Sequence, residues 1–195
     1  MKKLSLLFIL IISFTINLFA ENSAKVKRIF EGKEDAKITI ITYESLTCGH
    51  CADFHKNVYP ELKKEFIDKG LVKIEFRHFP LDIAAFNASK IAQCNNDGKS
   101  NLLHILYSNQ KKWAKGETVE EVNSHLKKLI NDEGINLDFK KCIDNKNIED
   151  YILNDRIEGV KKFKVNSTPT IIINDKKFDK APNYKNIKKT LEKLI

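Results

Sequence analysis

Residues 37–55, KITIITYESLTCGHCADFH, decide the fold of this chain. The apolar, β-branched run at residues 38–43 is typical of a buried central strand, and a helical run follows the two cysteines. This junction places Cys48 at a helix N-terminus, where free N–H groups and the helix dipole favour an anion. His50 can add positive charge or a hydrogen bond to the same sulfur. The pattern therefore predicts a nucleophilic thiol suited to thiol–disulfide exchange.

The segments on either side extend this motif into a β-α-β unit. Apolar residues recur every four positions from Phe54 to Phe66, which predicts a helix over residues 48–69 that Pro60 should kink and Gly70 should end. Residues 71–78 alternate in polarity and predict the next strand. Residues 28–30 predict a short edge strand before the motif.

The remainder of the chain is helical before it returns to strands. Residues 83–163 carry a series of helical patterns separated by turn signals. Residues 170–173 and 177–178 predict two strands, and residues 183–195 a last helix. We therefore predict an α/β fold in which βαβ and ββα halves form one sheet domain, residues 21–82 and 164–195, with an α-helical insertion at residues 83–163.

The N-terminus has the layout of a secretory signal peptide. Lys2 and Lys3 precede a mostly apolar run, and Ala20 stands before polar residues, so cleavage is expected after residue 20. An uncleaved membrane anchor is the alternative, because the run approaches the length of a membrane span. Export would place the protein in the periplasm.

Charge and cysteine content narrow the function classes. The formal net charge is +8, but the lysines are scattered and only three arginines are present, which argues against a nucleic-acid surface. Four cysteines in an exported chain predict oxidisable pairs. Cys48 and Cys51 pair by spacing. Four cysteines allow three pairings. Only the pairing of Cys48 with Cys51 and of Cys94 with Cys142 leaves the active-site dithiol free to cycle between its reduced and oxidised forms.

Several motifs in order resemble the DsbA-type thiol–disulfide oxidoreductases, bacterial envelope proteins with a thioredoxin fold and a helical insertion. The resemblance covers residues 25–195 and rests on four segments, namely residues 43–55, 79–82, 109–113 and 165–170. It implies that Cys48 attacks the client and that Cys51 resolves the mixed disulfide. It also implies that Pro169 is cis and that the backbone at Thr168 lies against the sulfurs and pairs with the client.

The resemblance carries further expectations. Cys94 and Cys142 match a second cysteine pair found in some members, which we expect to be a structural disulfide, with a second redox couple as the alternative. The expected partners are exported cysteine-containing client proteins and a quinone-linked membrane reoxidase. No cofactor or metal is expected, and we expect a monomer.

One position departs from the family pattern. Many relatives have a buried glutamate six residues before the nucleophile, where this chain has Thr42. Glu44 has the same parity along the strand and could face the same side, but a surface carboxylate at the strand end is an equal alternative. His78, His104 and His125 are expected at the surface or at strand edges.

Two rival functions stay open. Gly49-His50 is also the dipeptide of protein disulfide isomerases, so a disulfide isomerase or reductase is the rival within redox chemistry. A non-catalytic metal-binding or chaperone module is the rival from another class. His55 lies one turn past Cys51 and could form a metal site with Cys48, His50 and Cys51.

Overall fold

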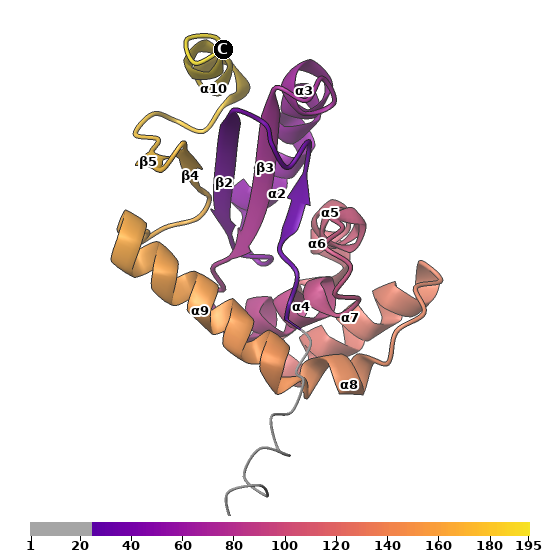
Figure 1. The fold of residues 1–195 in the computed structure, drawn as a ribbon. Coiled ribbons are helices and arrows are strands. Elements are labelled where there is room, and N and C mark those ends of the chain that lie inside the picture. Colours follow the sequence, from indigo (N-terminus) through magenta and orange to yellow (C-terminus); the bar gives the residue numbers. More distant parts are fainter. Residues whose placement is uncertain (1–24) are drawn as a thin grey trace, which may run out of the picture.

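The computed structural model describes residues 25–195, and the predicted signal peptide lies outside these residues. The described strands form one sheet in the order β1-β3-β2-β4-β5 (Figure 1). Their bounds are β1 (Ile29–Glu31), β2 (Ile38–Glu44), β3 (Val72–His78), β4 (Thr170–Ile173) and β5 (Lys176–Lys177). β2 is central, parallel to β3 and antiparallel to β4, and β1 and β5 are antiparallel edges. The predicted α/β fold class is confirmed.

The helices fall into three groups along the chain. Between β2 and β3 lie α2 (Gly49–Asn57), α3 (Tyr59–Leu62) and the π-helical segment η2 (Lys63–Ile67). Between β3 and β4 lie α4 (Ile83–Gln93), α5 (Asn101–Ser108), α6 (Gln110–Trp113), α7 (Val119–Asp132), α8 (Phe139–Ile143) and α9 (Lys146–Phe163). The last helix is α10 (Tyr184–Leu191). In Figure 1, α4, α7 and α8 gather beyond the end of β3, whereas α10 lies at the opposite end of the sheet. No helix within residues 25–195 has the length and apolar character needed to cross a membrane.

β2 is buried on both faces, which explains its continuous apolar run. Ile40 belongs to the larger core, which the sheet shares with α2, α3 and the insertion helices. Ile41 and Tyr43 point the other way and pack with Phe79 and Phe163. Because neighbouring residues of a strand face opposite sides, a strand between two cores must be apolar at nearly every position.

The helix predicted over residues 48–69 is divided into three segments. α2 ends before Val58, and Pro60 lies in the first turn of α3. The N–H groups of a first turn have no partner within the helix, so a proline there costs no hydrogen bond. The chain then widens into η2 before Gly70 turns with φ of +72°. The expected kink is therefore a break, and the π-helical segment was not predicted.

Helix α9 approaches the sheet closely because Gly159 has no side chain. A Cβ atom at this position would lie 2.8 Å from Cε1 of Tyr43. The Tyr43 ring is buried and its hydroxyl accepts a hydrogen bond from Nη1 of Arg77 at 3.2 Å, so the ring has little room to move. Gly159 thus sets the distance between α9 and β2.

Substituting Gly159→Ala should lower the free energy of unfolding by about 1 kcal/mol, because overpacking outweighs the gain in helix propensity. Lys161→Ala, at an exposed position of the same helix, is the matched control and should change stability by less than about 0.5 kcal/mol. Urea denaturation followed by circular dichroism measures both. Equal stability of the two variants would show that the Tyr43 ring can move aside for the added methyl group without cost.

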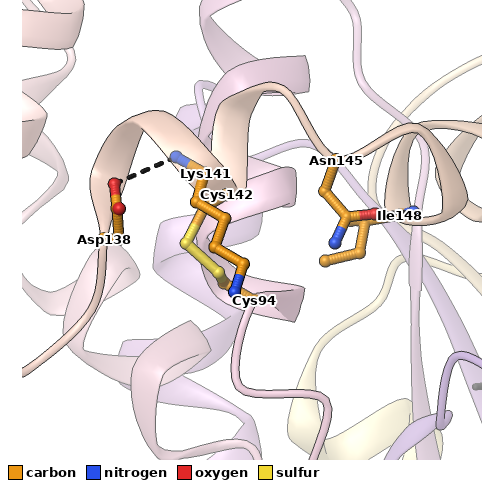
Figure 2. The surroundings of a disulfide bond; sticks show 6 residues. All are labelled: Cys94, Asp138, Lys141, Cys142, Asn145 and Ile148. Atoms are coloured by element: carbon orange, nitrogen blue, oxygen red, sulfur yellow. Dashed lines mark hydrogen bonds between the residues drawn. A yellow bond between two sulfur atoms is a disulfide. The ribbon is translucent and has the colours of Figure 1, made fainter.

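A disulfide joins Cys94, at the end of α4, to Cys142 in α8 (Figure 2). The short helix α8 begins at Asp138, whose side chain accepts a hydrogen bond from the backbone N–H of Lys141. Asn145 caps α9 in the same way through the N–H of Ile148. The Asp138 cap and one covalent bond therefore hold α8, a short helix that alone would be marginal.

Replacing both Cys94 and Cys142 by Ala should reduce the free energy of unfolding by about 4 kcal/mol, because the disulfide closes a loop with a sequence separation of 48. Thiol–disulfide exchange at Cys48 and Cys51 should be largely retained. Calorimetry and an insulin-reduction assay on the same preparation test the two parts. Loss of exchange in a folded variant would contradict the structural role that we propose for this disulfide.

Candidate active site

Cys48 lies where the sequence predicted it, between the end of β2 and the start of α2. It is the N-cap residue of α2, with extended backbone angles and no side-chain capping hydrogen bond. The first N–H groups of the helix are therefore free to face the sulfur. The Cys48 side chain is partly exposed, whereas Cys51, one turn further along α2, is buried.

The loop before β4 forms the second wall of the site. β4 pairs antiparallel with β2, with Tyr43 opposite Thr170, so the residues before β4 lie beside those after β2. The Thr168–Pro169 peptide bond is cis. The carbonyl oxygen of Thr168 lies 3.4 Å from the Cys48 sulfur. Four of the predicted site residues, Cys48, Cys51, Thr168 and Pro169, are thus brought to one place.

The surroundings of Cys48 favour its thiolate and lower the pKa of Cys48 to about 5. The largest cause is a hydrogen bond from the thiol of Cys51, and partial burial of the sulfur opposes it. Thr168 and the backbone N–H groups of Cys51 and His50 also lower the pKa. The Thr168 hydroxyl has no other hydrogen-bond partner within residues 25–195, so it is free to donate to the thiolate.

The pKa values of the two cysteines are shifted in opposite directions. Burial is the main cause that raises the pKa of Cys51, followed by its hydrogen bond to Cys48 and by the charge of Glu44. At neutral pH the pair therefore holds one negative charge on the outer sulfur and one proton on the inner sulfur. This is the division of roles that a nucleophile and a resolving thiol require.

His50 contacts Cys48 through its backbone rather than its ring. The imidazole is exposed and lines a cavity of about 480 Å³ together with Phe54, Thr168 and Pro169. The N–H of His50 is the group that stabilises the thiolate. An effect of the imidazole on the thiolate remains a prediction.

Glu44 is buried, which corrects the surface alternative considered from the sequence. Only 4% of the residue is exposed, and its Oε2 lies 2.7 Å from Nε2 of His55. Thr42 is also buried on this face and donates a hydrogen bond to the carbonyl of Glu75. Glu44 therefore faces the active-site helix, as its parity with Thr42 allowed.

The prediction that His78 lies at the surface was wrong, and His104 is only partly at the surface. His78 is buried and contacts Gln93, and burial lowers its pKa. His104 is half-buried, and its Nδ1 lies 3.1 Å from Nδ1 of His55. His125 lies on α7, partly exposed, with Nδ1 near the carbonyl of Lys115. The two histidines have different partners, since His78 of β3 is covered by Gln93 of α4, whereas His104 of α5 packs against His55 and Glu31 of the sheet domain.

Gln110 is a site residue that the sequence analysis did not single out. Its side-chain amide donates hydrogen bonds to the carbonyl oxygens of Leu46 at 2.8 Å and Cys48 at 3.0 Å. It thereby ties α6 to the turn that carries the nucleophile. Its position within residues 109–113, one of the segments that resemble DsbA proteins, was the available signal.

A second cavity, of about 680 Å³, lies on the other side of α2, between this helix and α5–α6. His55 and Tyr107 line it, and Lys56, Lys111 and Lys112 give it a basic rim. Within residues 25–195, no three His, Cys, Asp or Glu side chains are grouped so that they could hold a metal ion.

This sheet order, with a Cys-x-x-Cys at a helix N-terminus facing a cis-proline, defines a thioredoxin-type protein. A family model described as "Thioredoxin" matches residues 24–193, and the chain belongs to this family. The crystal structure of Wolbachia pipientis alpha-DsbA1 is similar with a TM-score of 0.76 and 29% identity, covering 86% of this chain and 90% of that chain. The resemblance to DsbA proteins is thus confirmed.

Curated relatives carry names from the same chemistry. A putative protein-disulfide oxidoreductase of Rickettsia bellii is 29% identical over 147 residues, which are 73% of this chain and 55% of the relative. Disulfide bond formation protein D of Bacillus subtilis is 28% identical over 173 residues, 84% of this chain and 75% of the relative. The chain thus spans little more than half the length of the Rickettsia relative.

Titrating the reduced protein should reveal one thiolate that forms with a midpoint near pH 5. Absorbance at about 240 nm follows the thiolate, and Cys48→Ala should remove the transition. Because the folded pKa lies below that of a free thiol, this group stabilises the reduced fold most at alkaline pH. The stabilisation declines as the pH falls and is lost below about 5. A midpoint above about 8 would contradict the site geometry.

Proposed function

We propose that this protein is a thiol–disulfide oxidoreductase that donates its Cys48–Cys51 disulfide to exported client proteins. The observation that carries the proposal is the activated sulfur of Cys48 at the mouth of α2, beside the cis bond before Pro169. The names of the curated relatives and the similarity to DsbA proteins support it.

The reaction follows from the unequal sulfurs. A client thiolate attacks the sulfur of Cys48, the disulfide opens, and Cys51 leaves and takes up a proton. A second client thiolate then attacks the client sulfur of the mixed disulfide, and Cys48 leaves as a thiolate. The client loses two electrons and two protons. The enzyme gains both electrons and one proton at Cys51, and the other proton goes to solvent at neutral pH.

The direction of exchange favours oxidation. A low pKa of Cys48 stabilises the reduced enzyme, and a stabilised reduced form makes the disulfide a stronger oxidant. A disulfide isomerase remains the rival, because the Gly49-His50 dipeptide is shared with isomerases. The lowered pKa is the specific observation that favours the oxidase.

The client is expected to bind as an extended segment along the loop that ends at Pro169. The Thr168 carbonyl and neighbouring backbone can pair with a peptide whose cysteine reaches Cys48. The adjacent cavity of about 480 Å³ offers an apolar wall formed by Phe54, Val58 and Pro182 for a client side chain.

Cell location and partners complete the proposal. We infer that residues 1–20 direct export and that the mature protein acts as a monomer in the periplasm. A quinone-linked membrane reoxidase would return the disulfide to Cys48 and Cys51. The oxidising site and the protein-disulfide names of the relatives support this assignment.

Refolding of reduced ribonuclease by the oxidised protein tests the function. The wild type should restore ribonuclease activity, whereas Cys48→Ala should restore none. Reduced Cys51→Ala, mixed with scrambled ribonuclease, should accumulate a mixed disulfide that mass spectrometry detects, because Cys48 attacks a client disulfide and no second enzyme thiol releases the client. The same assay with scrambled ribonuclease separates an isomerase from an oxidase.

Two outcomes would contradict the oxidase. Faster rescue of scrambled than of reduced ribonuclease would identify an isomerase. No thiol-dependent activity, together with stoichiometric uptake of a metal ion by the wild type, would replace the enzyme by a binding module.

A further inference from the structure

A basic cavity lies beside the nucleophile, on the side of α2 that faces α5 and α6. Its volume is about 680 Å³, which is larger than the apolar cavity of about 480 Å³ on the cis-proline side. Lys56 belongs to α2, whereas Lys111 and Lys112 belong to α6, so both walls contribute ammonium groups. We call this space, rimmed by Lys56, Lys111 and Lys112, the lysine cavity.

The positive charge of the lysine cavity is not neutralised within the described part of the protein. Among residues 25–195, no carboxylate forms an ion pair with Lys56, Lys111 or Lys112. Asp53 is the one acidic residue in the lining, so three positive side chains face one negative side chain. All four are exposed to solvent. An uncompensated charge of this kind attracts anionic groups to the cavity.

The walls of the lysine cavity are held in place by buried contacts. On the α2 side, the buried ring of His55 stacks on Tyr107 of α5 with ring centroids 4.0 Å apart. On the α6 side, Gln110 donates hydrogen bonds to the carbonyl oxygens of Leu46 and Cys48. Lys111 follows Gln110 directly in the sequence. The position of the basic rim is therefore fixed relative to the nucleophile.

The lysine cavity begins one residue from the reactive sulfur. Gly49 lines it, and a Cβ atom added to Gly49 would meet no atom within 4 Å outside its own helix backbone and chain neighbours. A peptide bound at Cys48 can therefore cross the first turn of α2 without obstruction. Lys56 comes eight residues after Cys48 in the same helix, about 12 Å along the axis. An extended peptide covers this distance in about four residues.

The two cavities offer different chemistry to one client segment. Asp53 lines both of them, so they adjoin at the exposed face of α2. The cavity on the cis-proline side has an apolar wall that includes Phe54 and Val58, whereas the lysine cavity presents positive charge. A client whose cysteine lies at Cys48 can therefore place an apolar side chain on one side of α2 and acidic side chains on the other.

We propose that the lysine cavity selects clients that carry acidic side chains within about four residues of the reacting cysteine. This inference rests on the proposed function, because a client must bring its cysteine to Cys48 before its neighbouring residues can reach the cavity. Complementary charge accelerates the encounter and favours one register of the bound segment. Lys56, Lys111 and Lys112 act on binding and take no part in the exchange of sulfurs.

The experiment measures how fast the reduced protein reacts with peptides whose single cysteine carries a 2-pyridyl disulfide. The Cys48 thiolate forms a bond to the peptide sulfur, and 2-thiopyridone leaves with the electron pair, takes up a proton and is followed by its absorbance. One pair of peptides has a run of glutamates or of glutamines after the cysteine, within about four residues, and a second pair has the same runs before it.

The quantity compared is the rate with the glutamate peptide divided by the rate with the glutamine peptide. Within one protein this ratio cancels the reactivity of Cys48, and between two proteins it cancels the reactivity of the peptides.

Lys56→Glu combined with Lys111→Glu reverses one charge on each wall. For at least one placement of the glutamates, the ratio should fall about tenfold below its wild-type value, because attraction becomes repulsion. The same variant should react faster with a lysine peptide than with the glutamine peptide. Lys127→Glu combined with Lys161→Glu is the matched control, since it changes the net charge equally at exposed positions of α7 and α9 outside the cavity. Its ratio should stay within about twofold of the wild type.

Equal ratios in the wild type and in the variant with both cavity lysines reversed, for both placements, would overturn the inference and leave the proposed function standing. An equal fall in the control variant would assign the effect to net charge and would also overturn it. A wild type that reacts with none of the peptides would overturn the proposed function as well. If the double cavity variant does not fold, Lys111→Glu alone decides by the same ratio, with Lys127→Glu as its control.

Discussion

The site depends on a helix whose N-terminal donors are left without a cap. Cys48 occupies the N-cap position and makes no side-chain capping bond, so the N–H groups of the first turn are available to a negative sulfur. Antiparallel pairing of β2 with β4 then fixes the opposite wall, because Tyr43 lies opposite Thr170 and this register places Thr168 and Pro169 beside the residues that follow β2. Sheet pairing rather than loop conformation thus aligns the two halves of the site.

The helical insertion takes part in the chemistry of the site. Gln110 holds the carbonyl of the nucleophile, Tyr107 covers His55, and His104 extends the buried polar line to the surface. These three residues lie on α5 and α6, close together in sequence. An insertion that only filled space would not place polar groups beside the active-site helix, since burying them requires partners on the sheet domain.

The sequence was sufficient for what local rules determine. Local sequence patterns predicted the strand before the cysteines, the position of Cys48 at the start of a helix and the proline before β4. The structure has all three where they were expected. The burial of Glu44 and His104 could not be predicted in this way, because it depends on partners in other elements. The spacing of Cys51 and His55, one helical turn apart on the buried side of α2, was the one local signal that pointed to this cluster.

The burial of Glu44 and the burial of His55 depend on each other. A two-residue step along a strand keeps a side chain on the same face, so a carboxylate at Glu44 still points towards the helix as one at Thr42 would. A buried carboxylate without a partner would be protonated or would destabilise the fold. His55 supplies the partner, and His104 with Glu31 supplies the partner of His55 in turn. His55, His104 and Glu31 therefore provide the hydrogen-bond partners that a carboxylate buried at residue 44 requires.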